Sequence, residues 1–104
     1  MLLTEKDYCD NQTSNELEKL GYPRYHYDAT EVDKIFRIIP LYAAQKWLRE
    51  EKGIIILVHH LITEEGDWEW EISYRYRSKD MYHSYEEALS EGIKESVKIL
   101  KEDR

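Results

Sequence analysis

The sequence predicts an α+β fold, in which helices pack on one face of a small antiparallel sheet of three to four strands, as a two-layer sandwich. Three observations support this class. Apolar residues recur at helical spacing over 40–52 and again from Ser84 onward. Apolar and charged residues alternate over 68–77, which is typical of a half-buried strand. Finally, the elements follow one another as helix, one or two strands, helix, hairpin and helix.

The chain has 104 residues, so residues 1–104 are expected to form a single domain. Residues 1–13 are polar and show no periodicity, which predicts a loose N-terminal leader. The side chains of 13–15 are suited to capping a short helix over about 14–20. Gly21 and Pro23 then end that helix.

The next segment predicts one or two strands and then a helix. Residues 24–27 alternate, and the β-branched residues within 34–39 favour extended structure. Pro40 fits the first turn of a helix over 40–52, and Gly53 provides its left-handed cap. That helix is expected to turn Leu41, Ala44 and Leu48 inward.

A β-hairpin is predicted around residues 54–77. The nearly continuous apolar run 54–62 indicates a strand covered on both faces, and 63–67 is a turn that contains Gly66. In the second arm, the residues expected to face the core are Trp68, Trp70, Ile72, Tyr74 and Tyr76. The residues expected to face water, with acids toward one end and arginines toward the other, are Glu69, Glu71, Ser73, Arg75 and Arg77.

The last helix begins with a capping box at Ser84 and Glu87, in which the serine hydroxyl accepts from the backbone three residues on. Its apolar stripe carries small residues at 88, 92 and 96, so the helix is expected to lie close to the sheet. Glu91 and Lys94 are expected to form an i,i+3 ion pair on the solvent-facing side of this helix.

Composition excludes several classes of function. The net charge of −7 repels nucleic acid, and the basic residues are scattered. Cys9 is the single cysteine, which rules out an intrachain disulfide and favours a reducing cytoplasm. The apolar run 54–62 is far too short to span a membrane, and the N-terminus lacks the pattern of a signal peptide. We therefore expect a cytoplasmic protein that binds neither nucleic acid nor membrane.

No residue set predicts catalysis, a cofactor or a metal. His59 and His60 are adjacent in a strand and point to opposite faces, so they are poorly placed to share one ion. The acids around the hairpin turn are expected to be solvated rather than catalytic. The aromatic residues of the second hairpin arm are expected to be in the core, and the alternative is that they form a protein interface. The candidate interface residues are Trp68, Trp70, Tyr74, Tyr76, His59 and His60.

Two segments, PLYAAQKWLRE at 40–50 and YEEALSEGIK at 85–94, resemble a family of small uncharacterised proteins of bacteriophages and mobile elements of gut anaerobic bacteria. The resemblance covers about residues 14–100 and implies the same order of elements and a phage-derived origin. It implies no catalytic residue.

The sequence thus leads to a main hypothesis and two alternatives. The main hypothesis is a non-enzymatic phage or mobile-element accessory protein that binds another protein. One version of this hypothesis is a homodimer that forms through an exposed part of the sheet. The first alternative is an acidic mimic of nucleic acid that blocks a host DNA-binding protein. The second is a small-molecule enzyme, which would need a pocket with convergent polar groups.

Overall fold

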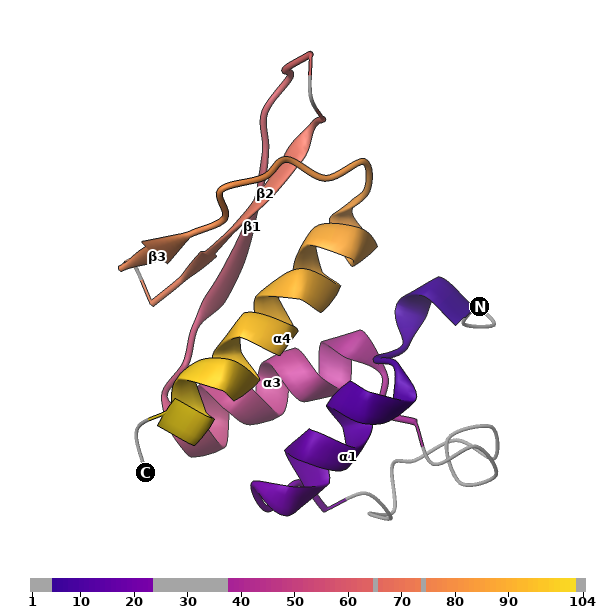
Figure 1. The fold of residues 1–104 in the computed structure, drawn as a ribbon, viewed down its shortest axis with the longest axis vertical. Helices are drawn as coiled ribbons and strands as arrows, with labels where there is room; N and C mark the ends of the chain where they lie inside the picture. The colour runs from indigo at the N-terminus through magenta and orange to yellow at the C-terminus, as the bar shows by residue number, and fades with distance from the viewer. Residues whose placement is uncertain (1–4, 24–37, 65, 74, 103–104) are drawn as a thin grey trace.

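The computed structural model describes residues 5–23, 38–64, 66–73 and 75–102 (Figure 1). Along the chain the elements are η1 (Glu5–Asp7), α1 (Asn11–Lys19), α3 (Leu41–Lys52), β1 (Ile56–His60), β2 (Trp68–Ile72), β3 (Tyr76–Arg77) and α4 (Tyr85–Glu102). Helices pack beside a small antiparallel sheet, so the predicted α+β class is confirmed.

The sheet has three strands in the order β1-β2-β3, with both pairs antiparallel. Ile56 lies opposite Ile72, and His60 lies opposite Trp68. α4 packs directly on β1 and β2, and α1 and α3 in turn pack against α4. α4 therefore lies between the sheet and the other two helices, and the hairpin of β1 and β2 extends beyond the helices (Figure 1).

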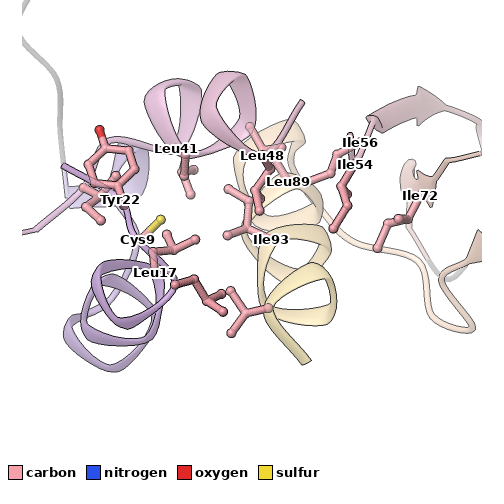
Figure 2. Close-up of a cluster of buried hydrophobic side chains, with 14 of the residues drawn as sticks. Cys9, Leu17, Tyr22, Leu41, Leu48, Ile54, Ile56, Ile72, Leu89 and Ile93 are labelled. Atoms are coloured by element: carbon pink, nitrogen blue, oxygen red, sulfur yellow. The ribbon is translucent and has the colours of Figure 1, made fainter. Parts of the chain in front are cut away.

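The core forms where α4 meets its neighbours. Leu17 of α1, Leu41 and Leu48 of α3, and Leu89 and Ile93 of α4 point toward one another between the helices (Figure 2). On the sheet side the core continues into Ile54, Ile56, Trp70 and Ile72. This arrangement follows from the amphipathic pattern of α4, whose stripe has to be buried on both the sheet and the helices.

The ends of α3 and α4 agree with their predicted signals. Pro40 is the N-cap residue of α3, and Gly53 closes the helix with a left-handed φ of 67°. Leu41, Ala44 and Leu48 are buried as expected. The hydroxyl of Ser84 accepts a hydrogen bond from the Glu87 backbone N–H at 3.1 Å, which confirms the predicted cap of α4.

The predicted loose leader is wrong for residues 5–13, whereas 1–4 lie outside the described residues. Asp10 is the N-cap residue of α1, and its carboxylate accepts from the Thr13 N–H at 2.7 Å, so the helix begins at Asn11 rather than near 14. Cys9 is only 3% exposed and donates its N–H to the Ile39 carbonyl at 2.8 Å. Polarity misled the prediction, because small polar side chains such as Thr13 are buried here.

The strands predicted at 24–27 and within 34–39 fall mainly on residues 24–37, outside the described part of the chain. Ile38 and Ile39 lead into α3 without belonging to a strand, and Pro40 forms an isolated bridge with Tyr8. The N-terminal segment is thereby held against the start of α3.

The second arm of the hairpin is shorter than predicted. β2 ends at Ile72, Ser73 adopts a left-handed φ of 49°, and the Arg75 N–H donates to the Ile72 carbonyl. The chain then returns, and Tyr76 and Arg77 pair with Ile72 and Glu71 as β3. A single strand over 68–77 was therefore the wrong interpretation, and Tyr76, which was expected to face the core, is exposed on β3. β1 is likewise shorter than the predicted 54–62.

Among the described residues, no helix is both long enough and apolar enough to cross a membrane.

Candidate functional site

The five candidate interface residues that the structure describes do not form one surface. Trp70 is 8% exposed and belongs to the core, while Tyr76 is 47% exposed on β3. Tyr74 lies outside the described residues. His59 lies opposite Glu69 in the ladder, and His60 lies opposite Trp68. Because adjacent residues of a strand point to opposite faces, the two histidines lie on opposite faces of β1, as predicted.

On the helix side of the hairpin, three rings pack in series. His60 stacks on Trp68 with ring centroids 4.4 Å apart, and Trp68 meets Tyr85 of α4 edge to face at 5.8 Å. Trp68 is half-buried, whereas His60 and Tyr85 are exposed. These contacts fix the upper part of the hairpin against the first turn of α4.

On the opposite face of the sheet, charged side chains pair across all three strands. His59 Nε2 lies 2.9 Å from Glu71 Oε1, and Arg77 Nη2 lies 3.5 Å from the same oxygen. Arg77 also lies 4.0 Å from Glu69 Oε1. Arg77 thus pairs with both acids across strands, although the prediction placed all three residues in one strand. The Arg77 guanidinium therefore lies beside both carboxylates, and the described residues form no continuous acidic ribbon on this face.

Among the described residues, the large hydrophobic side chain with the highest exposed fraction lies at the tip of the hairpin. Ile62 is 88% exposed and Leu61 is 46% exposed. Gly66 donates its N–H to the Thr63 hydroxyl at 3.1 Å, which helps close the tip beneath them. The sequence prediction placed both residues in a covered strand. Their position directly before the polar turn at Thr63 was the available signal that they lie past the end of the strand.

A groove of about 440 Å³ lies between α1 and α4. Two ion pairs join the helices there: Lys94 Nζ lies 3.4 Å from Asp10 Oδ2, and Lys101 Nζ lies 3.0 Å from Glu16 Oε2. Partial burial acts to raise the pKa of Asp10, but the Thr13 hydrogen bonds and the Lys94 ammonium together hold that pKa below its usual value. The two ion pairs therefore hold α1 and α4 together across the groove, and we assign no reaction to the groove.

Cys9 is the one thiol in the chain, and its environment suppresses its reactivity. Burial, together with the negative charge of Asp10, raises the pKa of Cys9 to about 12. The thiolate is the nucleophilic form, so a protonated, buried thiol is inert. Within the described ranges, no three His, Cys, Asp or Glu residues are grouped so that they could hold a metal ion.

Comparison of the chain with protein-family models, with curated proteins and with solved structures finds no match. The resemblance to phage and mobile-element proteins therefore stays a prediction.

Proposed function

We propose that this chain is a non-enzymatic accessory protein, encoded by a phage or mobile element and acting in the cytoplasm, that binds another protein through its hairpin. The observation that carries this proposal is the exposed pair Leu61 and Ile62 at the tip of a hairpin that projects beyond the helices (Figure 1). Burying an aliphatic side chain of this size contributes about 1.5 to 3 kcal/mol.

The surroundings of the tip also favour protein binding. The tip continues directly from β1, and Tyr85 at the start of α4 adds an exposed ring that contacts Trp68, the residue of β2 closest to the tip in sequence. Tyrosine is enriched at protein interfaces because its ring buries a large area and its hydroxyl tolerates water. A protruding apolar tip with an exposed tyrosine beside the hairpin is suited to insertion into a pocket of a partner.

Enzymatic activity and nucleic-acid mimicry receive less support. Glu69 and Glu71, the two acids of β2, are paired with Arg77 and His59. A mimic of nucleic acid would instead need unpaired carboxylates at phosphate-like spacing. The buried thiol of Cys9 also supplies no nucleophile.

The experiment is a pull-down with the tagged full chain from cells that carry the native element. Wild type is compared with the double variant Leu61→Ser/Ile62→Ser and with a matched control, Tyr42→Ser. Tyr42 is 56% exposed on α3 and lies away from the hairpin in sequence and fold. We expect the same partner to be recovered by wild type and by the control but lost by the tip variant, with all three giving the same circular dichroism spectrum. Recovery by all three chains would contradict the proposal.

A further inference from the structure

The tip of the hairpin, residues 61–67, carries negative charge beside its exposed apolar pair. The segment contains three acids and no Lys or Arg, and the nearest Lys or Arg in the sequence on either side are Lys52 and Arg75. Glu64 is exposed and Asp67 is half-buried. Among the described residues, no cation forms an ion pair with either carboxylate. The tip therefore combines exposed apolar surface with uncompensated negative charge.

The acids on β2 differ from those at the tip. Glu71 Oε1 lies 2.9 Å from His59 Nε2 and 3.5 Å from Arg77 Nη2. The same guanidinium lies 4.0 Å from Glu69 Oε1. Negative charge is thus paired on β2 and left unpaired at the end of the hairpin that projects beyond the helices (Figure 1). The unpaired acids of the hairpin therefore lie next to the exposed apolar pair.

Backbone contacts fix the tip before any partner binds. The Leu61 N–H donates to the Asp67 carbonyl at 2.7 Å, and the Asp67 N–H donates to the Tyr82 carbonyl at 3.0 Å. Gly66 is buried against the backbone of Met81 and Tyr82, since a Cβ atom at Gly66 would lie 2.8 Å from the Tyr82 carbonyl oxygen. A segment that is already ordered loses less conformational entropy on binding. The backbone that carries the apolar pair and the acids is therefore preorganised.

We propose that the partner bound by the tip is a protein that presents an apolar pocket with Lys or Arg on its rim. This inference rests on the proposed function, because it names the chemistry of the protein that Leu61 and Ile62 bind. Leu61 and Ile62 fill the pocket, and Glu64 and Asp67 face its rim. The rim is cationic because carboxylates that lose water without gaining a partner oppose binding. An apolar centre with a polar rim is the usual arrangement of a protein interface.

The charge of the tip disfavours other occupants. A second copy would bring two acidic tips together, and each chain carries a net charge of −7. Anionic lipid headgroups and the phosphates of nucleic acid would be repelled in the same way. A pocket with a neutral rim would cover the apolar pair but leave the acids without partners. A basic protein surface is the occupant that satisfies both kinds of residue.

The test uses a small molecule that has the chemistry of such a pocket. β-Cyclodextrin has an apolar cavity, and its rim can carry hydroxyl, amine or carboxylate groups, so that three rings share one cavity and differ in rim charge. Each ring is titrated into the full chain with isotope-labelled methyl groups, and binding is followed at the methyl resonances of Leu61 and Ile62. We expect the amine ring to bind there about fivefold more tightly than the hydroxyl ring, and the carboxylate ring to bind most weakly.

The variant that isolates the charge is Glu64→Gln/Asp67→Asn, with Glu50→Gln/Glu51→Gln as its matched control. Both double variants remove two negative charges, and Glu50 and Glu51 are exposed on α3, away from the hairpin. We expect the preference for the amine ring to fall below about twofold in the tip variant and to be kept in the control. Thermal melts confirm that each variant is folded.

Three results would overturn the inference. The first is equal binding, or no binding, of the three rings at the Leu61 and Ile62 methyl groups. The second is a preference for the amine ring that survives in Glu64→Gln/Asp67→Asn. The third is pelleting of the chain with vesicles of phosphatidylcholine and phosphatidylserine, which would identify a lipid surface as the occupant.

The pull-down described above separates this inference from the proposed function. If Glu64→Gln/Asp67→Asn captures the protein partner as wild type does, while Leu61→Ser/Ile62→Ser does not, the cationic rim is refuted and the proposed function stands. If Leu61→Ser/Ile62→Ser also captures the partner, the proposed function itself fails.

Discussion

Gly92 of α4 packs against Ile56 of β1: a Cβ atom at Gly92 would lie 3.0 Å from Ile56 Cγ2. The same atom would lie 3.3 Å from Trp70 Cβ on the neighbouring strand. The missing side chain thus lets α4 lie over the joint between β1 and β2.

The substitution Gly92→Ala has two opposing effects on the free energy of unfolding, one from helix propensity and one from crowding in the core. Alanine stabilises a helix interior by about 1 kcal/mol relative to glycine, but forcing a methyl group into a packed core costs about 1 to 3 kcal/mol. Because Ile56 is buried and Trp70 Cβ is fixed to the backbone, crowding is expected to prevail by about 1 kcal/mol. Urea unfolding measures the change in the free energy of unfolding. Ser90→Ala, on a half-exposed position of α4, is the control and should not destabilise; a stabilised Gly92→Ala would contradict the close packing.

Ile72→Ala should be among the most damaging single changes to the sheet. Ile72 is 1% exposed and belongs to the core cluster, so its truncation leaves a cavity beneath α4. The expected loss in free energy of unfolding is about 2 to 5 kcal/mol. Ile62→Ala removes the same atoms at a position that is 88% exposed, and should change stability by less than about 0.5 kcal/mol. Equal melting temperatures for the two variants would refute the assigned register.

The elements that could be predicted from the sequence are those whose signals are local. α3 and α4 have a helical apolar stripe together with a cap, and both were placed to within a residue or two at their starts. The inward residues Trp70 and Ile72 followed from alternation alone. These features depend on neighbours within a few positions, which a single sequence displays directly.

The features that were missed depend on contacts between distant segments. The burial of Cys9 requires Ile39, thirty positions away, to accept its N–H. At the turn, Ser73 adopts a left-handed conformation, which is uncommon for a residue other than glycine and was not predicted from the neighbouring sequence. The exposure of Leu61 and Ile62 likewise could not be read from their hydrophobicity, because burial depends on where the strand ends.

Ser14→Ala should expose a long-range role for a polar residue. Ser14 is fully buried in α1, and its hydroxyl accepts a hydrogen bond from the Ile39 N–H at 3.1 Å. Removing the acceptor leaves a buried donor unpaired, which costs about 1 to 3 kcal/mol, although alanine regains a few tenths as a helix former. Chemical denaturation measures the loss, and amide exchange at Ile39 should accelerate. Gln12→Ala, on the exposed side of α1, should change neither quantity.

Cys9 should make stability fall at alkaline pH. Burial, and then Asp10, raise the pKa of Cys9 from 9.0 to about 12, so between those values the unfolded chain loses the thiol proton while the folded chain keeps it. The unfolded state is therefore favoured as pH rises above 9, and the stabilisation is fully present below that pH. At pH 10 the expected loss from this group is about 1.4 kcal/mol relative to pH 8.

The matched comparison is Cys9→Ala, which removes this titration but leaves the lysines and tyrosines that also respond to alkaline pH. The free energy of unfolding is measured at pH 8 and pH 10 for both chains, and wild type should lose more than the variant by the amount attributed to the thiol. A thiol reagent at pH 8 gives an independent readout: Cys9 should react only as fast as the chain opens, because the folded state holds the thiol buried and protonated. Rapid labelling of the folded chain, with equal pH dependence in both proteins, would show that Cys9 is outside the core.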